Sequence, residues 1–245
     1  MTSMGVVTAL LLTGTLAGMV LLAGLSRLRT RMWSAAGVVL PLLPMAYLLN
    51  RFIRAPFFDY LGTQANLPPF LDLEMPWWFL GLWWLFPPLL EEWAKALVFL
   101  FPPASRLLQD ARPAFLGGML AGLAYALGET VYVHWATPDP SVVNLAGYAA
   151  ERAAFTLLHG ALTAQVALGL ARGRGGALRA FLAAAGLHAL AILGIVLMQV
   201  GLIEPLAALI ALWAGTLLAL GWGIWQARRM FRERDAESLD NLSAR

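Results

Sequence analysis

Hydrophobic residues along this chain gather into seven long runs separated by shorter, more polar connections. A helix that crosses a bilayer uses about 20 apolar residues, and each run reaches or approaches that length. The pattern therefore predicts an all-α, polytopic membrane protein, with about seven transmembrane helices in a single transmembrane domain over 1–245. The longest connection, 51–76, is expected to be a loop. The predicted spans are 5–25, 33–50, 76–101, 113–135, 146–170, 178–201 and 205–226, followed by a short polar tail at 227–245.

Composition supports this class and excludes others. Hydrophobic residues make up 60% of the 245 residues and charged residues only 13%, whereas soluble domains average roughly 45–50% and 25%. So few charges could not cover the surface of a free soluble globule, and intrinsic disorder requires the opposite balance. The absence of cysteine excludes disulfides, thiolate metal sites and a cysteine nucleophile.

The basic residues are distributed unevenly between the predicted loops. Of the 17, 13 fall in loops on one side of the membrane and two on the other, and Lys95 and Arg152 lie within spans. The positive-inside rule then places the N-terminus outside and the C-terminus in the cytoplasm, in a multi-pass protein of the inner cell membrane. We interpret the net charge of +3 as a signal of topology, so the expected partner is the lipid bilayer and no nucleic acid.

The third predicted span carries three charged residues. A charge at the bilayer centre costs roughly 2.5–3.5 kcal/mol and usually faces a bundle interior where it has a function. Glu91, Glu92 and Lys95 fall within one face of a helix because their spacing is i,i+3 and i,i+4. Pro87-Pro88 is expected to kink or interrupt the helix just before them. A purely structural ion pair is the alternative, but two carboxylates with one ammonium favour a functional group.

Polar side chains also form stripes on two later spans. Gly118, Gly122, Tyr125, Glu129 and Tyr132 follow each other at steps of four and three residues, which places them on one helix face. The glycines allow a neighbouring helix to approach closely, and Glu129 should then face that neighbour. Packing alone would explain the glycines. The next span carries a second stripe: Arg152, Thr156, His159 and Thr163.

Two histidines complete the predicted cluster. His159 lies in the fifth span and His188 in the sixth, while His134 lies at the outer end of the fourth and is expected to have no role. With a rise of 1.5 Å per residue, Glu91, His159 and His188 all lie roughly 20 Å from the outer ends of their spans, and Glu129 roughly 10 Å. The sequence therefore predicts that these groups converge at one depth, with Glu129 within reach.

Carboxylates and imidazoles around a wet cavity suit hydrolysis. A glutamate can take a proton from water, and a histidine can stabilise the oxyanion or protonate the leaving group. The same groups could instead bind zinc, with Glu92, Glu129, His159 and His188 as the candidate ligands and an open position for water. The spacing does not decide between these mechanisms. There is no HExxH motif, and nothing indicates a Ser/His/Asp triad.

The order of these motifs resembles the PrsW family of intramembrane proteases, and more distantly the superfamily that includes CAAX prenyl endopeptidases. The similarity covers about 90–190. It rests on EExxK in one span, GxxYAxxE in the next and single histidines in two later spans. Glu91, Glu92 and Lys95 match the first motif, Tyr125, Ala126 and Glu129 match the second, and His159 and His188 match the later histidines.

This resemblance implies a membrane-embedded peptidase that cleaves membrane-anchored proteins, in some bacteria anti-sigma factors. Two positions depart from the pattern: Thr130 follows Glu129 where the family tends to have Asn, and Ile192 stands where the wider superfamily often has Asn. Ile192 weakens the case for an amide that holds the oxyanion.

The resulting hypothesis is an intramembrane endopeptidase with its catalytic core at about 76–201. Glu91 or Glu92 would be the general base on water, assisted by His159 and His188, with Glu129 as a third polar wall or a metal ligand. Lys95, Tyr125, Arg152 and Thr163 are the expected supporting residues, and Lys95 would hold the Glu pair.

Two other functions use the same residues. A proton- or ion-coupled transporter would use the Glu/His groups as a relay, although we find no inverted repeat. An inactive scaffold that binds membrane proteins would have lost the chemistry. The intact Glu and His positions count against a scaffold.

Overall fold

The computed structural model describes residues 32–67, 72–136 and 148–243, and every regular element in these ranges is helical. The first long helical stretch consists of α2 (Met32–Leu49), the π-helical turn η2 (Asn50–Arg54) and α3 (Ala55–Gln64). The next elements are α4 (Trp77–Val98), the short α5 (Pro102–Ser105) and the 3-10 turn η3 (Arg106–Gln109). The last four helices are α6 (Ala111–Ala136), α7 (Tyr148–Ala171), α8 (Arg174–Gln199) and α9 (Pro205–Ser243).

Five of the described helices are long and apolar enough to cross a membrane, which agrees with the predicted class of protein. They are Trp33–Gln64, Ala111–Val133, Ala149–Ala171, Arg174–Gln199 and Pro205–Glu233. The predicted span 76–101 corresponds to α4, which has the length of a span but carries the three charged residues. The predicted span 5–25 lies outside the described residues.

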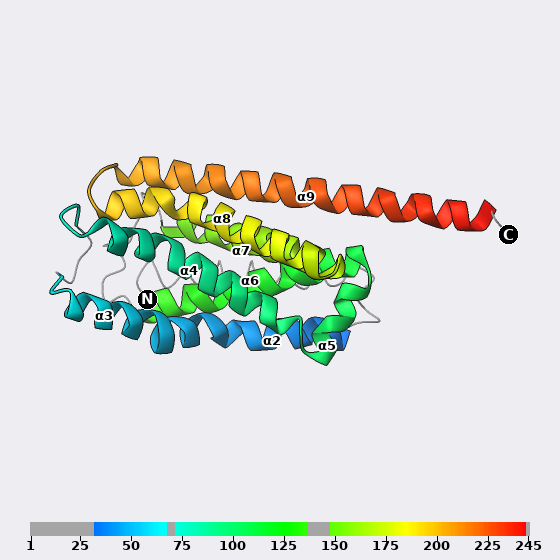
Figure 1. Ribbon diagram of the computed structural model, residues 1–245, viewed down its shortest axis with the longest axis horizontal. Coiled ribbons are helices and arrows are strands. Elements are labelled where there is room, and N and C mark those ends of the chain that lie inside the picture. Colours follow the sequence, from blue (N-terminus) through cyan, green and yellow to red (C-terminus); the bar gives the residue numbers. More distant parts are fainter. Residues whose placement is uncertain (1–31, 68–71, 137–147, 244–245) are drawn as a thin grey trace.

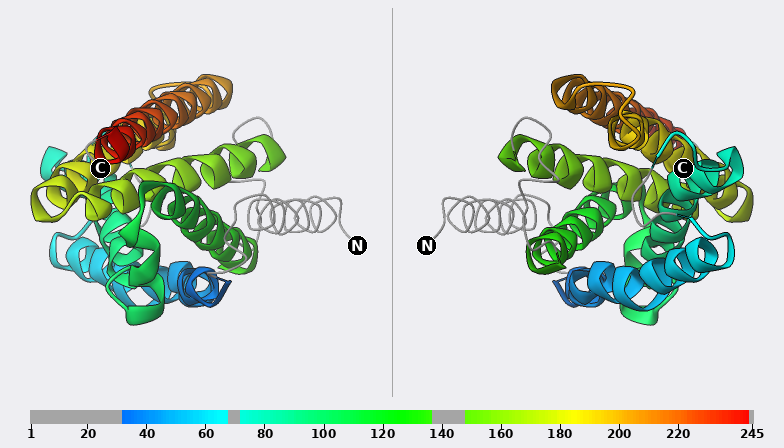
Figure 2. Two further views of the ribbon diagram at one scale, coloured as in Figure 1. Left: turned by 90° about the vertical axis from the view of Figure 1, so that its right-hand side faces the viewer. Right: turned by 90° about the vertical axis from the view of Figure 1, so that its left-hand side faces the viewer.

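The helices pack lengthwise into one bundle (Figure 1). α7 contacts α6, α8 and α9, while α6 also packs against α2. Seen along the bundle, α2 and α9 lie on opposite sides, with α6 and α7 between them (Figure 2). α4 packs mainly against α8 and also contacts α2 and α7. This arrangement brings α4, α6, α7 and α8 together, so the polar stripes of four helices face a common interior.

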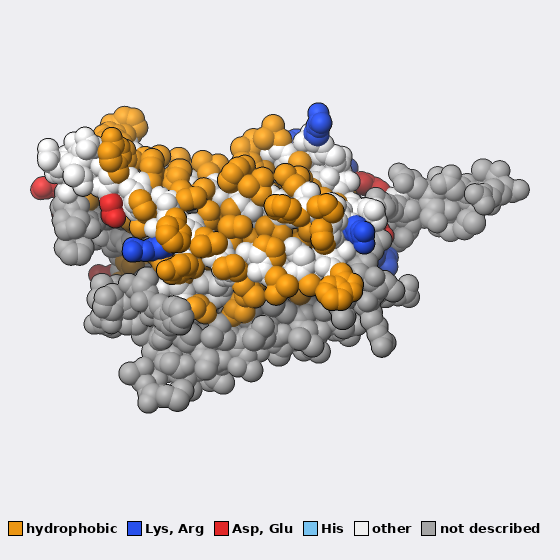
Figure 3. Space-filling model, turned by 90° about the horizontal axis from the view of Figure 1, so that it is seen from below, with side chains coloured by type: hydrophobic (Ala, Val, Ile, Leu, Met, Phe, Trp, Pro, Cys, Tyr) orange, Lys and Arg blue, Asp and Glu red, His pale blue; other side chains and the backbone are white. Residues whose placement is uncertain are grey.

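The surface agrees with a bilayer environment. Figure 3 shows one face of the molecule, where hydrophobic side chains cover the middle and the charged side chains lie toward the two ends. Many large apolar side chains on the outer helices are exposed, among them Trp33, Leu190 and Leu218. An apolar band of this kind matches the hydrocarbon region of a membrane, because lipid tails are the solvent there.

The expected loop at 51–76 is wrong over its first half, because the helix continues to Gln64. Pro56 lies in the first turn of α3, where a missing backbone N–H is tolerated. The aromatic residues that followed it in the sequence pack inward: the Phe58 ring lies 4.5 Å from the Trp83 ring and 5.8 Å from the Phe79 ring of α4. This packing against α4 stabilises the helical extension.

One further expectation is corrected in part, because α4 runs without interruption through Pro87 and Pro88, and both prolines are buried. The polar tail at 227–245 was expected to be the end of a helix, and α9 does continue into it as one helix to Ser243, past the other helices (Figure 1).

Candidate functional site

The predicted polar residues meet where α4, α6, α7 and α8 come together, and this confirms that they converge. Glu92, Lys95 and His159 have no exposed surface, and Glu91 and His188 are 5% and 3% exposed. The Glu129 side chain is 13% exposed, the most of the group. Each helix contributes what its stripe predicted: Glu91, Glu92 and Lys95 come from α4, Glu129 from α6, His159 from α7 and His188 from α8.

The glycine stripe of α6 determines how closely α7 approaches. A Cβ atom at Gly122 would lie 2.0 Å from the backbone oxygen of His159, and one at Gly118 would lie 2.5 Å from Cα of Ala164. Only glycine permits backbones this close. The close approach predicted from the spacing is therefore confirmed, and it holds His159 directly against α6.

Lys95 connects α4 to α7. Its Nζ donates to Glu92 Oε1 at 2.6 Å and lies 2.8 Å from His159 Nδ1. It also lies 4.6 Å from the centre of the Tyr125 ring, within range of a cation–π interaction. The expectation that Lys95 holds both glutamates is only half met: within the described residues its ammonium forms an ion pair with Glu92 and none with Glu91.

Glu92 connects α4 to α8. Its Oε1 accepts a hydrogen bond from His188 Nδ1 at 3.0 Å as well as the bond from Lys95. About two turns before Glu92 in α4, Trp84 Nε1 donates to the backbone oxygen of Ala189 at 2.6 Å. α4 and α8 are thus joined by two polar contacts, one of them adjacent in sequence to His188.

Glu129 forms the other end of the chain of contacts. Its Oε2 lies 3.3 Å from His159 Nε2 and 3.6 Å from Arg152 Nη1. Arg152 also pairs with Glu151, and its guanidinium lies 4.5 Å from the Phe155 ring. Alternating donors and acceptors therefore run from α7 through α6 and α4 to α8.

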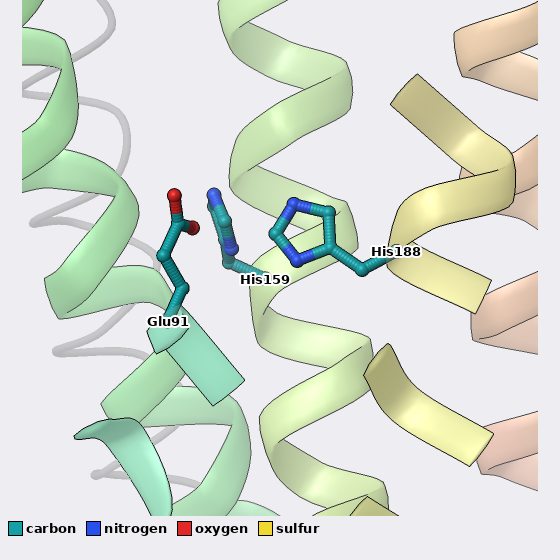
Figure 4. A group of neighbouring side chains, drawn as sticks. All are labelled: Glu91, His159 and His188. Atoms are coloured by element: carbon teal, nitrogen blue, oxygen red, sulfur yellow. The ribbon is translucent and has the colours of Figure 1, made fainter. Parts of the chain in front are cut away.

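Glu91 stands apart from this chain of contacts. Its Oε2 is buried and has no hydrogen-bond partner among the described residues. Its carboxylate nevertheless points toward the two imidazoles (Figure 4), and one ligand atom from each of Glu91, His159 and His188 lies within 4.8 Å of the others. A buried polar atom without a partner costs free energy. Glu92 Oε2 is in the same condition, but Glu91 differs from Glu92 because it makes no hydrogen bond or ion pair with the described residues.

The remaining predicted residues differ in their surroundings. The Tyr125 ring lies 5.1 Å from the His159 ring, and its hydroxyl is buried without a hydrogen-bond partner. Thr163 Oγ1, one turn beyond His159, is also buried without a hydrogen-bond partner among the described residues. Tyr132 packs instead against Tyr47 of α2. The side chain of His134 lies outside the described residues.

The metal hypothesis can be tested against these contacts. Ligand atoms of one tetrahedral zinc lie about 3.4 Å apart, and ligands need a free lone pair. His188 fits, because its Nδ1 is held by a carboxylate as in many zinc-binding histidines. His159 does not fit, since both of its ring nitrogens are within hydrogen-bonding distance of other groups and one of them faces an ammonium. The expected ligands Glu92 and Glu129 are each bonded to cationic or imidazole partners.

Sequence reasoning missed several buried polar residues, among them Glu151 and Asn50. Glu151 is 2% exposed and pairs with Arg152; its position next to an intramembrane arginine was the available signal. Asn50 is 5% exposed in the π-helical turn, where its Oδ1 accepts a hydrogen bond from Arg54 at 3.3 Å. Nothing in the spacing of α2 indicated that Asn50 would be buried.

No family model, curated protein or solved structure matches this chain.

Proposed function

We propose that this chain is an intramembrane endopeptidase that hydrolyses peptide bonds of membrane-anchored proteins such as anti-sigma factors. One observation carries the proposal. A buried carboxylate oxygen of Glu91 without a hydrogen-bond partner lies beside two imidazoles, inside a bundle of apolar helices. The resemblance of the EExxK, GxxYAxxE and histidine motifs to the PrsW family gives the substrate class.

Glu91 is the better candidate for the general base. Glu92 Oε1 already accepts hydrogen bonds from Lys95 of α4 and His188 of α8, so Glu92 joins these two helices. The second oxygen of each glutamate, Oε2, is buried without a hydrogen-bond partner among the described residues. Glu91 differs from Glu92 because it makes no ion pair or hydrogen bond with the described residues, which leaves its carboxylate available to a water molecule. The two adjacent glutamates therefore have different roles: Glu91 reacts with water, and Glu92 positions the helices around it.

The reaction follows from the residues present. Glu91 takes a proton from water while the water oxygen bonds to the carbonyl carbon of the scissile peptide. The proton passes from Glu91 to an imidazole nitrogen, and the N–H formed there stabilises the negative oxygen that develops and then protonates the leaving amine as the C–N bond breaks. The products are a carboxylate and an amine. Because His159 lacks a free ring nitrogen, we favour this glutamate mechanism over a metal-dependent one.

The proposed topology has seven spans, with α4 and the segment 5–25 added to the five apolar helices. The N-terminus is outside and the C-terminus cytoplasmic in the inner membrane of a bacterium, as the distribution of arginines indicates. Fusions of a reporter enzyme after Gln226 and within 137–147 would test this orientation. A cytoplasmic signal from the second fusion would contradict it.

A proton- or ion-coupled transporter is the second candidate, and a specific observation supports it. The contacts from Arg152 through Glu129, His159, Lys95 and Glu92 to His188 join titratable groups on four helices into one continuous series, and buried series of this kind mark proton pathways in transporters. A relay and a hydrolytic site would differ in whether peptide bonds break.

The test is cleavage of a single-pass anti-sigma-type substrate by the purified protein in lipid nanodiscs. Cleavage is expected for the wild type and for Glu204→Gln, which removes an exposed carboxylate, and is expected to be lost in Glu91→Gln. Glu92→Gln and His188→Ala should also cleave poorly. Undiminished cleavage in all three site variants would contradict the proposal. Proton flux in proteoliposomes without cleavage would favour the transporter, and substrate binding alone would favour a scaffold.

A further inference from the structure

The contacts of His159 determine which of its nitrogens carries hydrogen. Lys95 Nζ lies 2.8 Å from His159 Nδ1. An ammonium group has only hydrogen-bond donors, so Nδ1 must be the acceptor. The ring hydrogen then lies on Nε2, which donates to Glu129 Oε2 at 3.3 Å. Both nitrogens of His159 are therefore used within the protein.

The contacts of His188 require the opposite arrangement. His188 Nδ1 lies 3.0 Å from Glu92 Oε1, and that oxygen also accepts a hydrogen bond from Lys95 at 2.6 Å. An ionised carboxylate only accepts, so the hydrogen of His188 lies on Nδ1. Its Nε2 carries a lone pair and makes no hydrogen bond with the described residues.

We infer that Lys95 is a positioning residue that holds His159 and His188 in opposite tautomers, which leaves His188 Nε2 as the imidazole nitrogen able to accept a proton beside Glu91. Lys95 acts on both rings: it bonds one directly and fixes the carboxylate that bonds the other. The two rings lie 5.1 Å apart and nearly perpendicular, at 83°. His159 then serves only as a donor, directed at Glu129, and His188 serves as an acceptor.

The tautomers rest on the contacts alone, whereas their use in peptide hydrolysis rests on the proposed function. Under that proposal His188 Nε2 can receive the proton that Glu91 removes from water, and can later return it to the leaving amine. In a proton relay the same tautomers would persist without any cleavage. Failure of the inference is therefore distinguishable from failure of the proposed function.

The experiment is nitrogen-15 NMR of the full-length protein labelled at histidine, in lipid nanodiscs. The shift and coupling of each ring nitrogen show whether it carries hydrogen. His134→Gln, His159→Gln and His188→Gln assign the signals. The expected wild-type spectrum has hydrogen on Nε2 of His159 and on Nδ1 of His188. Hydrogen on Nδ1 of His159, or on Nε2 of His188, would overturn the inference.

Variants test whether Lys95 fixes the tautomer of His159. Glu129→Ala removes the acceptor at Nε2, but Lys95 still donates to Nδ1, so His159 should keep its tautomer in this control. Adding Lys95→Met to Glu129→Ala removes the donor to Nδ1 as well, so His159 should then show a mixture of tautomers. Lys95→Arg in the Glu129→Ala background, which also only donates, should keep the single tautomer. An unchanged His159 signal in the folded Glu129→Ala, Lys95→Met variant would contradict the role of Lys95. If that variant does not fold, the wild-type spectrum and the Lys95→Arg variant decide.

Discussion

Gly122 is the position where a single methyl group should disturb both the fold and the site. In Gly122→Ala the new carbon would lie 2.0 Å from the backbone oxygen of His159 and 2.4 Å from its carbonyl carbon. Contacts this short do not occur, and ordinary contact begins near 3.4 Å. Because the opposing atoms are backbone, α6 and α7 would have to move apart by more than an ångström.

The size of the effect follows from this displacement. Overpacking of a close contact costs about 1–3 kcal/mol. A shift of α7 also carries His159 away from Glu129, since the 3.3 Å contact between Nε2 and Oε2 crosses the same helix interface. Misplacement of a catalytic group by about 1 Å can reduce a rate roughly 100-fold. We therefore expect Gly122→Ala to lose both stability and cleavage.

Gly160→Ala is the matched control on the facing helix. Its new methyl would meet the Cε atom of Met119 at 3.3 Å, the end of a flexible side chain that can move. Both substitutions gain the same helix propensity, about 1 kcal/mol, so the comparison isolates the interhelical contact. The assay is reversible unfolding in mixed detergent micelles, followed by cleavage of the substrate. Equal free energies of unfolding for the two variants would refute the reasoning.

Four other predictions concern the site. Lys95→Met should lower the free energy of unfolding by about 3–5 kcal/mol, because it leaves the buried carboxylate of Glu92 without its ion-pair partner. Glu91→Gln should change the free energy of unfolding by less than about 1 kcal/mol, since no hydrogen bond to Oε2 is lost. The same unfolding assay measures both. Trp84→Phe should cost about 1 kcal/mol by removing the hydrogen bond to Ala189, and an unchanged value would show that this contact is absent in the membrane. Cleavage should persist after treatment with a chelator; loss of cleavage that added zinc restores would show a metal-dependent mechanism.

Helical periodicity explains why much of the site could be predicted. Steps of three and four residues place Gly122 and Glu129 on one face of α6, and the glycines allow α7 to approach this face. Glu129 was expected to lie at a shallower depth than His159 but within its reach, and its Oε2 lies 3.3 Å from His159 Nε2. The apolar runs predicted the helices themselves for the same reason, because few other structures suit 20 apolar residues in sequence.

The division between Glu91 and Glu92 could not be predicted from the sequence. Adjacent residues on a helix point only about 100° apart. Both carboxylates can therefore lie on the side of α4 that faces the bundle interior, and the spacing does not distinguish them. Which of them bonds to Lys95 depends on where α7 and α8 place His159 and His188, and those positions come from tertiary packing. The extension of α3 depends in the same way on the packing of Phe58 against α4.

The π-helical turn Asn50–Arg54 has a consequence for the register of the helix that follows it. A π turn holds one residue more than an α turn, so it acts as a phase shift of about 100° between α2 and α3. A face that follows the α-helical repeat through α2 is therefore displaced by one residue in the sequence of α3. If the same residues formed a regular α-helix instead, Phe58 would be rotated by about 100° away from Trp83. The turn thus determines the orientation in which the aromatic face of α3 packs against α4.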